Sequence, residues 1–271
     1  MLHFIYMIIS FGLGVYFILS GAVTFSFIGR VAFLLAFTLV GYISLFLVQL
    51  LIFVIIGSTI NVNKLPKTID TIYRRYGLAT LKVFVDSFRI KVDSTGLEKL
   101  PNEPFLLVSN HRSFFDPLVG IELFKKHNLA WISKEENMRI PAVGKYMFAV
   151  GCIPINRSST KEAIKSINKA AEYIKTGYCS IGIYPEGKEN KVDDIPLLPF
   201  RDGAFKIAKK ACCPVVVTTI KNSRHVFKSF MFRPIHIKID VLDVIDKDTV
   251  KSLKTPELSK LSSDIMLENL I

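Results

Sequence analysis

The chain has 271 residues, half of them hydrophobic, and its 35 Lys and Arg against 23 Asp and Glu give a formal net charge of +12. Its four cysteines show no Cys-x-x-Cys spacing and no nearby histidine partner, which argues against the common zinc motifs and predicts free thiols in a reducing compartment. No glycine-rich dinucleotide loop, Walker loop or nucleic-acid motif accompanies the basic charge. We therefore expect no metal, no cofactor and no nucleic-acid partner.

The first 63 residues differ in composition from the rest of the chain. They contain no acidic residue and only one Lys or Arg, Arg30, whereas residues 64–271 carry the other 34 basic residues and all 23 acidic ones. Residues 1–29 and 31–63 are each long enough, at about 1.5 Å per helical residue, to exceed a hydrocarbon core of about 30 Å. The sequence predicts a membrane hairpin of two helices over residues 1–63 that turns near Arg30.

Other interpretations of this apolar segment are a signal peptide, a pair of helices that enters one leaflet, and a buried pair in a soluble core. A cleaved signal peptide is disfavoured, because no basic region precedes the first apolar stretch and a longer apolar stretch follows at once. Hydropathy does not separate a spanning hairpin from one that enters a single leaflet. Glycine and serine residues and Gln49, which interrupt the apolar stretches, keep that alternative open.

Basic residues gather where the second apolar stretch ends. They are Lys64, Lys67, Arg74, Arg75 and Lys82. An excess of Lys and Arg next to a membrane segment marks the cytoplasmic side. We expect a cell-membrane protein whose residues 64–271 form a domain on the cytoplasmic face, where its excess of basic residues suits anionic lipids and anionic substrates.

Residues 64–271 show strand-like apolar runs that alternate with helical patterns. Helices are expected at residues 66–86, after Asp116, and at 141–150, 160–176 and 203–211. Strands are expected at residues 88–92, 104–108, 129–133, 152–155, 180–184, 214–219 and 235–242. Such alternation predicts one α/β domain with a mostly parallel sheet flanked by helices, and ligands collect beyond the carboxyl ends of the strands in such sheets.

The segment Asn110-His-Arg-Ser-Phe-Phe-Asp-Pro117 follows one of these strands and precedes a helix. It places a histidine and a carboxylate five residues apart, which is the minimum needed to take a proton from an alcohol. Asp116 before Pro117 also suits a helix N-cap followed by a first-turn proline. The alternative is therefore that Asp116 only caps the helix and His111 only occupies the turn.

Three further segments end at the same predicted edge of the sheet. Arg157 closes Gly151-Cys-Ile-Pro-Ile-Asn-Arg157 and offers a fork of donors that matches phosphate, unless it is an ordinary surface arginine. Glu186 and Gly187 stand in a tight turn after Tyr184-Pro185, where Glu186 either binds a substrate hydroxyl or braces the turn through an ion pair. Lys134 closes another strand, and a solvated lysine is the alternative there.

Together these segments resemble the glycerolipid acyltransferases, and within that family the 1-acylglycerol-3-phosphate (lysophosphatidic acid) acyltransferases. The resemblance covers about Pro104 to Thr219 and consists of an Asn-His-x4-Asp block, a Gly-x-x-x-Ile-Asn-Arg block and a Tyr-Pro-Glu-Gly block in the expected order. The apolar N-terminal segment is also similar to that of bacterial members. The resemblance implies a glycerol-3-phosphate acyltransferase-like α/β fold after the membrane hairpin.

The resemblance also implies roles for individual residues. It makes His111 the catalytic base and Asp116 its orienting partner. It assigns Arg157, Glu186 and Gly187 to the acceptor site and matches Lys134 to a lysine that helps to hold the phosphate. Ser113 as a nucleophile is disfavoured, because catalytic triads are usually assembled from separate segments.

The chain departs from the family pattern after the third block. The family usually has Thr-Arg after the glycine, whereas this chain has Lys188-Glu189, so that an arginine expected at the phosphate is absent. Lys188 or Lys191 could replace its charge but not its bidentate geometry. The last block also lacks one of its usual prolines, since it reads Pro214-Val-Val-Val217.

The expected reaction is transfer of a fatty acyl group from acyl-CoA or an acyl carrier protein to the sn-2 hydroxyl of lysophosphatidic acid at the bilayer. Candidates for an apolar groove that holds the fatty chain are Phe114, Phe115, Met147 and Phe148. Alternatives are the same chemistry on glycerol 3-phosphate or another lysophospholipid, and a non-catalytic membrane protein that binds anionic lipids.

Overall fold

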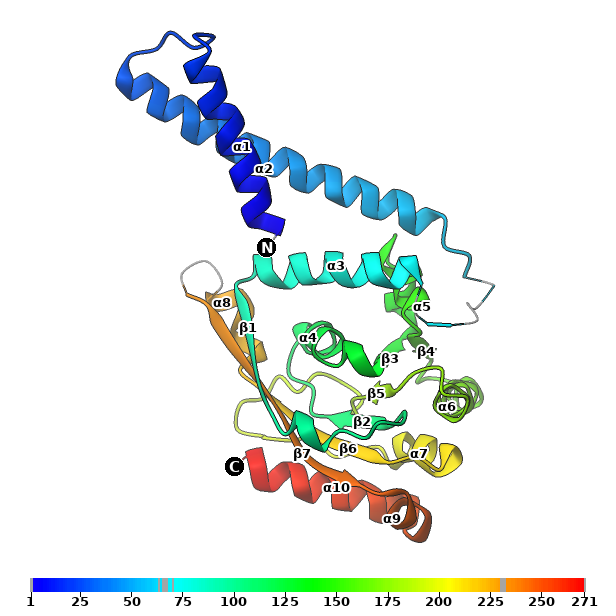
Figure 1. Cartoon of the computed structure of the whole chain (residues 1–271). Helices are drawn as coiled ribbons and strands as arrows, with labels where there is room; N and C mark the ends of the chain where they lie inside the picture. Colours follow the sequence, from blue (N-terminus) through cyan, green and yellow to red (C-terminus); the bar gives the residue numbers. More distant parts are fainter. Residues whose placement is uncertain (1, 63, 65–67, 70, 230–232, 271) are drawn as a thin grey trace. The chain divides into compact units, whose positions relative to one another are not determined.

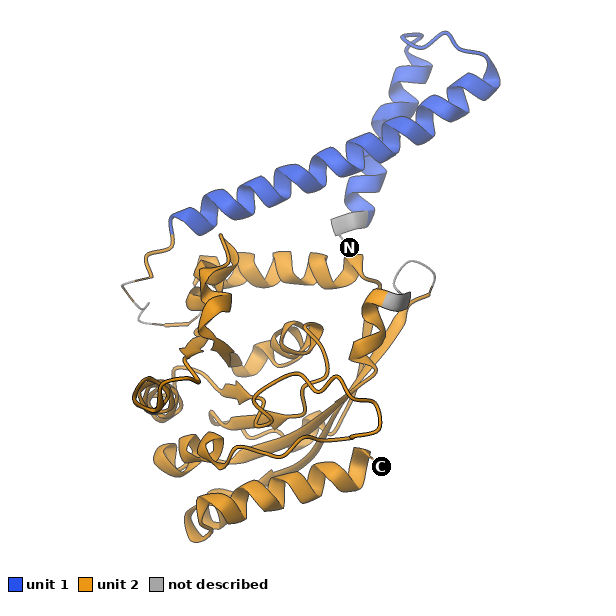
Figure 2. Cartoon of the chain, turned by 180° about the vertical axis from the view of Figure 1, so that it is seen from behind, with its two compact units in different colours: residues 1–59 blue, residues 60–271 orange. Residues whose placement is uncertain are grey.

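The computed structural model describes residues 2–62, 64, 68–69, 71–229 and 233–270. The chain forms two compact units, Met1–Thr59 and Ile60–Ile271 (Figure 2). The expected boundary after Asn63 falls outside the described residues.

The first unit is a pair of helices, α1 (Leu2–Leu19) and α2 (Phe27–Ser58). The two helices are joined by a hydrogen bond from the Tyr6 hydroxyl to Gln49 Oε1 at 2.8 Å. Gly14 and Gly41 allow them to approach closely, because a Cβ on Gly41 would lie 2.7 Å from the Ser10 hydroxyl oxygen on α1. Through its hydrogen bond with Tyr6, Gln49, which interrupts the apolar sequence, holds the two helices together.

The turn of this hairpin lies earlier than the sequence predicts. It comprises residues 20–26, and Arg30 lies inside the first turns of α2. Gly21 adopts a left-handed backbone with φ of 77°, and the Ser26 side chain accepts a hydrogen bond from the Gly29 amide as the N-cap of α2. A capping serine outweighs the charge of Arg30 as the signal for where the helix begins.

The early turn makes the two helices unequal. The 18 residues of α1 span about 27 Å, less than a hydrocarbon core of about 30 Å, whereas the 32 residues of α2 span about 48 Å. Within the described residues, only α2 is long and apolar enough to cross a membrane by length and composition. Large apolar side chains on both helices are exposed, including Phe4, Phe27 and Leu35.

The second unit contains a seven-stranded sheet in the order β1-β7-β6-β2-β5-β3-β4 (Figure 1). Its strands are β1 (Ile90–Thr95), β2 (Leu106–Ser109), β3 (Ala130–Lys134), β4 (Ile153–Ile155), β5 (Ile181–Ile183), β6 (Val215–Lys221) and β7 (Ile235–Ile245). Every neighbouring pair is parallel except β6 and β7, which run antiparallel. The predicted α/β domain with a mostly parallel sheet is confirmed.

Helices cover both faces of the sheet (Figure 1). The helices are α3 (Ile72–Ser87), α4 (Phe115–Leu123), α5 (Val143–Ala149), α6 (Thr160–Lys175), α7 (Lys206–Ala211), α8 (Val226–Ser229), α9 (Lys247–Ser252) and α10 (Thr255–Leu270). Successive residues of β2 enter opposite cores: Leu106 and Val108 join the core under α6, α7 and α10, and Leu107 joins the core under α3 and α4. Strand β2 is thus apolar throughout because both of its faces are buried.

Most predicted elements exist, with shifted ends. Helix α3 begins at Ile72, after Thr71 accepts a hydrogen bond from the Arg74 amide, and the expected start at residue 66 lies outside the described residues. Strand β1 begins at Ile90 rather than at Phe88, which caps α3. Helices α9 and α10 were not among the expected elements, and α10 covers the sheet with Leu258 and Met266 fully buried.

Asn110 fixes the carboxyl end of β2 against β6. Its side chain is 1% exposed, donates to the Ile220 carbonyl at 3.0 Å and accepts from the Ile220 amide at 2.7 Å. The amide side chain thereby continues the strand pairing by one step beyond Ser109. The next residue, His111, consequently starts from a fixed point at the edge of the sheet.

We expect Asn110→Ala to destabilise the protein by about 2 to 4 kcal/mol, because it leaves buried backbone groups of Ile220 without partners. Denaturant unfolding of the purified protein measures this change. Asn168→Ala is the control, since Asn168 is exposed and its side chain accepts a hydrogen bond from Lys210. Equal stability of the two variants would contradict the assigned role.

Candidate active site

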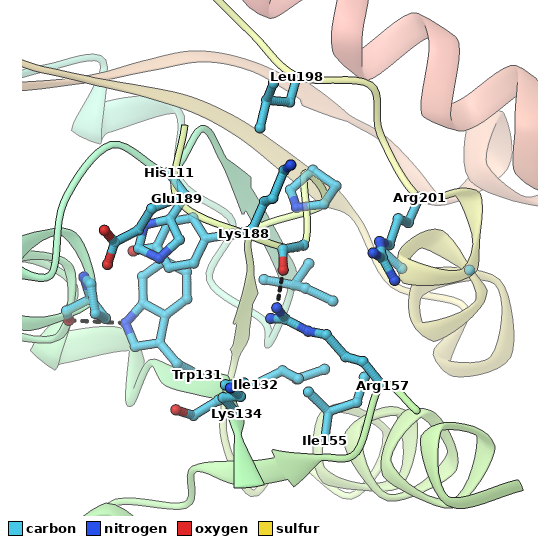
Figure 3. A pocket seen from close by; sticks show the side chains of 18 of the residues that line it. His111, Trp131, Ile132, Lys134, Ile155, Arg157, Lys188, Glu189, Leu198 and Arg201 are labelled. Atoms are coloured by element: carbon cyan, nitrogen blue, oxygen red, sulfur yellow. Dashed lines mark hydrogen bonds between the residues drawn. The ribbon is translucent and has the colours of Figure 1, made fainter. Parts of the chain in front are cut away.

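The segments that follow β2, β3, β4 and β5 meet around one cavity of about 880 Å³. Figure 3 shows side chains from these segments, among them His111, Lys134 and Arg157, around the opening. The sequence prediction that residues after separate strands converge at one sheet edge therefore holds for His111, Lys134, Arg157 and Gly187, all of which line this cavity.

His111 and Asp116 form a hydrogen-bonded pair. The distance from His111 Nδ1 to Asp116 Oδ2 is 2.9 Å, and the side chains are 17% and 0% exposed. The same carboxylate oxygen accepts from the amides of Arg112 at 2.6 Å and Ser113 at 2.8 Å. Because a carboxylate only accepts, Nδ1 must carry a proton in this pair, and Nε2 of a neutral ring then holds a lone pair that can take a proton.

Asp116 is not the helix cap that the sequence suggests. Helix α4 begins at Phe115, and Asp116 lies in its first turn. The carboxylate folds back to the amides of Arg112 and Ser113, which precede the helix. The Ser113 hydroxyl accepts from the Phe115 amide at 3.2 Å and does not line the cavity, in agreement with its exclusion as a nucleophile.

The backbone of His111 is held from both sides by the loop after β5. Its amide donates to Glu186 Oε1 at 2.6 Å, and its carbonyl accepts from the Asn190 amide at 2.7 Å. The second oxygen of Glu186 accepts from the Leu198 amide at 2.8 Å. Glu186 is 4% exposed and does not line the cavity, and burial raises the pKa of its carboxyl group. Its geometry fits the bracing alternative, through backbone amides rather than an ion pair.

Two aromatic rings that the sequence analysis did not single out support the imidazole. The ring of Tyr184 stacks on His111 with centroids 4.1 Å apart and planes 13° apart, and Trp131 stacks on Tyr184 at 4.4 Å and 7°. The Trp131 indole donates to the Pro117 carbonyl at 3.1 Å. The three rings come from different segments, and the stack holds the plane of the imidazole in place; Figure 3 labels His111 and Trp131, its two outer members.

Two glycines make room for this stack. A Cβ on Gly182 would lie 2.6 Å from the Trp131 ring, and one on Gly120 would lie 2.7 Å from it. Trp131 pairs with Gly182 across β3 and β5. A glycine two residues before Tyr184 in an otherwise apolar strand was the available sequence signal for a close approach.

Basic side chains line the cavity beside the histidine. Arg157 donates to the carbonyl of Gly187, and Lys188 is exposed at the rim. Lys134 also lines the cavity and forms an ion pair with Glu136 at 3.3 Å. A further arginine in this wall, Arg201, was missed because it lies in a segment without a recognised block.

The apolar wall of the cavity differs from the expected one. None of the candidates Phe114, Phe115, Met147 and Phe148 lines it. Phe115 is fully buried and packs against Phe88, with ring centroids 4.9 Å apart. The apolar lining instead includes Ile132, Ile155, Ala163, Ile167, Ile183 and Ala204, from the strands and the facing helices. Apolar residues on the helices near the His-Asp block therefore did not predict which side chains line the groove.

No group of three or more His, Cys, Asp or Glu side chains in the described part of the chain is placed to hold a metal ion. Cys152, Cys179 and Cys213 are buried and Cys212 is exposed. Burial raises the pKa of Cys152 to about 11 and that of Cys179 and Cys213 to about 12. These buried thiols stay protonated at neutral pH and are poor nucleophiles.

Comparison with known proteins relates this site to acyl transfer. A family profile described as Acyltransferase matches residues 91–221. The 1-acyl-sn-glycerol-3-phosphate acyltransferase of Saccharomyces cerevisiae is 25% identical over 67% of this chain and 60% of its own. That of Borreliella burgdorferi is 29% identical over 67% of this chain and 76% of its own. A chloroplastic enzyme of the same name from Brassica napus is 36% identical over 49% of this chain and 38% of its own.

The chain thus spans less than two thirds of the length of the yeast and Brassica relatives. Among solved structures, the 1-acyl-sn-glycerophosphate (LPA) acyltransferase of Thermotoga maritima matches with a TM-score of 0.58 and 23% identity, covering 73% of this chain and 79% of that one. This likeness shows that the two chains share a fold.

We expect Tyr184→Leu to slow a reaction in which His111 takes up a proton by about 2- to 10-fold, because a stacked aromatic pair contributes about 0.5 to 1.5 kcal/mol. Tyr184→Phe keeps the ring and is expected to stay near the wild-type rate. The turnover number and its pH profile, measured for both variants, check this role. A Leu variant as fast as the Phe variant would show that the stack does not position the imidazole.

Proposed function

We propose that the chain, whose residues 91–221 match the acyltransferase family profile, transfers a fatty acyl group from a thioester to the sn-2 hydroxyl of 1-acylglycerol 3-phosphate. The product would be phosphatidic acid. The observation that carries the proposal is the hydrogen-bonded His111–Asp116 pair at the wall of a cavity that also presents basic and apolar side chains. The names of the relatives support the choice of acceptor.

In the proposed reaction His111 is the general base. Its Nε2 takes the proton of the acceptor hydroxyl while the oxygen attacks the thioester carbonyl, so that a C–O bond forms and the C–S bond breaks. Asp116 holds the Nδ1–H tautomer and stabilises the imidazolium. The proton on Nε2 then passes to the leaving thiolate, which restores the neutral ring. No covalent acyl-enzyme is required.

The walls of the cavity suit the parts of such a lipid. Arg157, Lys188 and Lys134 supply positive charge for the phosphate. Isoleucines of β3, β4, β5 and α6 offer apolar surface to a fatty chain. Gly187 belongs to the acceptor site because its carbonyl orients Arg157. Glu186 supports this site by bracing the backbone of His111 and of the loop.

The donor is acyl-CoA or an acyl carrier protein, since the chemistry at the thioester is the same for both. Glycerol 3-phosphate and other lysophospholipids are the rival acceptors, because Lys188-Glu189 replaces the Thr-Arg pair that the resemblance leads one to expect at the phosphate. A panel of these acceptors with both donors, applied to the purified protein, separates the possibilities. Fastest transfer to lysophosphatidate supports the proposal, and preference for another acceptor replaces it.

We expect His111→Ala to lower the rate of acyl transfer by about 100- to 10,000-fold, because it removes the general base. His236→Ala is the matched control: His236 Nδ1 lies 2.8 Å from Asp93 Oδ2, but this pair is 55% and 57% exposed and does not line the cavity. The assay follows release of free thiol with acyl thioester and lysophosphatidate. Equal rates for the two variants would remove His111 as the base.

We further propose that residues 1–63 anchor the chain in the cell membrane and that residues 64–271 lie on its cytoplasmic face. The length of α2, the exposed apolar side chains of both helices and the basic residues that follow them support this arrangement. A bilayer anchor would also keep the catalytic residues close to a lipid acceptor.

The exposed Cys212 offers a test of this topology, because Cys152, Cys179 and Cys213 are buried. A membrane-impermeant maleimide is expected to label Cys212 in permeabilised cells but not in intact ones. Cys212→Ser is the control for labelling at other thiols. Strong labelling in intact cells would place the catalytic domain on the opposite face.

A further inference from the structure

We propose that Arg201 is a second arginine ligand for a phosphate group in the cavity and that it acts with Arg157 from the other side of the Gly187 turn. The class of ligand is a phosphate ester, carried either by the lipid acceptor or by the donor. Only the identity of the ligand rests on the proposed function. The placement of the two guanidinium groups does not.

Both arginines converge on Gly187. Arg157 donates to the Gly187 carbonyl. On Gly187 a Cβ would lie 2.6 Å from Arg201 Nε and 3.1 Å from its Cδ, so the Arg201 side chain rests against the bare Cα. Gly187 also has a φ of 77°, which favours glycine. Figure 3 shows both side chains, with Lys188, around this turn.

The backbone fixes Arg201 in this place although it is distant from Gly187 in sequence. The Arg201 amide donates to the Pro185 carbonyl at 2.9 Å, and the Arg201 carbonyl accepts from the Ala204 amide at 3.0 Å. Pro185 belongs to the same turn as Gly187. The guanidinium of Arg201 is therefore held against the turn that Arg157 contacts.

The charges of this wall are not balanced by the described part of the chain. Within the described residues, the guanidinium of Arg201 makes no hydrogen bond or ion pair. Burial, and then the positive charge of Arg201, lower the pKa of Arg157. The negative charge of Glu136 raises the pKa of Arg157, but Glu136 forms its ion pair with Lys134. Glu189 lies beside His111 rather than beside the two arginines (Figure 3).

Two like charges that approach each other without a counter-charge favour a bound anion. A phosphate ester suits this place, since guanidinium groups bind phosphate oxygens as planar forks. Arg157 has part of its fork committed to the Gly187 carbonyl, whereas that of Arg201 is entirely available within the described residues. Arg201 would therefore make the larger number of phosphate contacts.

Binding of inorganic phosphate tests the site without reference to acyl transfer. Phosphate at constant ionic strength is expected to raise the melting temperature of the wild-type protein, and Arg201→Met should need about 10- to 100-fold more phosphate for the same rise. Arg139→Met is the matched control, because Arg139 is 74% exposed, pairs with Glu135 and lies outside the cavity lining. The same phosphate response in Arg201→Met and wild type would overturn the proposal.

Steady-state kinetics then identify the source of the phosphate. A rise of about 10- to 100-fold in the KM for lysophosphatidate, with an unchanged KM for the donor, assigns Arg201 to the acceptor, and the reverse pattern assigns it to the donor. Arg201→Lys keeps the charge but loses the fork, and should lie between wild type and Arg201→Met. Unchanged KM values for both substrates in Arg201→Met would contradict a role in either.

The two experiments fail separately. If wild-type protein does not acylate lysophosphatidate but Arg201→Met still weakens the phosphate response, the acceptor assignment fails and the phosphate site stands. If transfer to lysophosphatidate is normal in Arg201→Met and its phosphate response is unchanged, the proposed function stands and Arg201 is not a ligand.

Discussion

One carboxylate oxygen organises the centre of this protein. Asp116 Oδ2 accepts from the His111 ring and from the amides of Arg112 and Ser113, and it does so in full burial. Because backbone amides only donate, Oδ2 must act as an acceptor, and its hydrogen bond with the ring then requires a proton on His111 Nδ1. The turn after β2, the start of α4 and the chemical state of the imidazole therefore depend on a single acceptor.

A second His-Asp pair in the same chain shows that the pairing distance alone has no functional meaning. His236 and Asp93 lie as close together as His111 and Asp116, but both are largely exposed at the edge formed by β1 and β7. The pair at the cavity differs in its surroundings: Tyr184 and Trp131 stack behind the ring, and Glu186 and Asn190 hold the backbone of His111. Burial and these fixed partners restrict the orientations of the His111 ring, whereas the ring of an exposed pair can still reorient.

The sequence was sufficient for the features that depend on periodicity and on local turn chemistry. Alternating strands and helices predicted the sheet, and strand ends predicted that the segments of His111, Arg157 and Glu186 would meet, although Glu186 itself contacts the His111 backbone and does not line the cavity. The sequence did not predict contacts between segments that are far apart in the chain. Arg201 reaches Gly187 because its amide donates to the Pro185 carbonyl, and Trp131 reaches Tyr184 across paired strands. The apolar groove is lined by residues of α6 rather than by Phe114. In the hairpin, the cap at Ser26 set the turn, whereas Arg30 had suggested a later one.

The state of the His111 ring tests the account most directly. In protein with ¹⁵N-labelled histidine, assigned by comparison with His111→Gln, NMR at neutral pH should show His111 with its proton on Nδ1 and an unprotonated Nε2, and Asp116→Asn should abolish this preference. A neutral His111 that carries its proton on Nε2 in the wild-type protein would contradict the account, because such a ring has no lone pair to offer to a hydroxyl in the cavity.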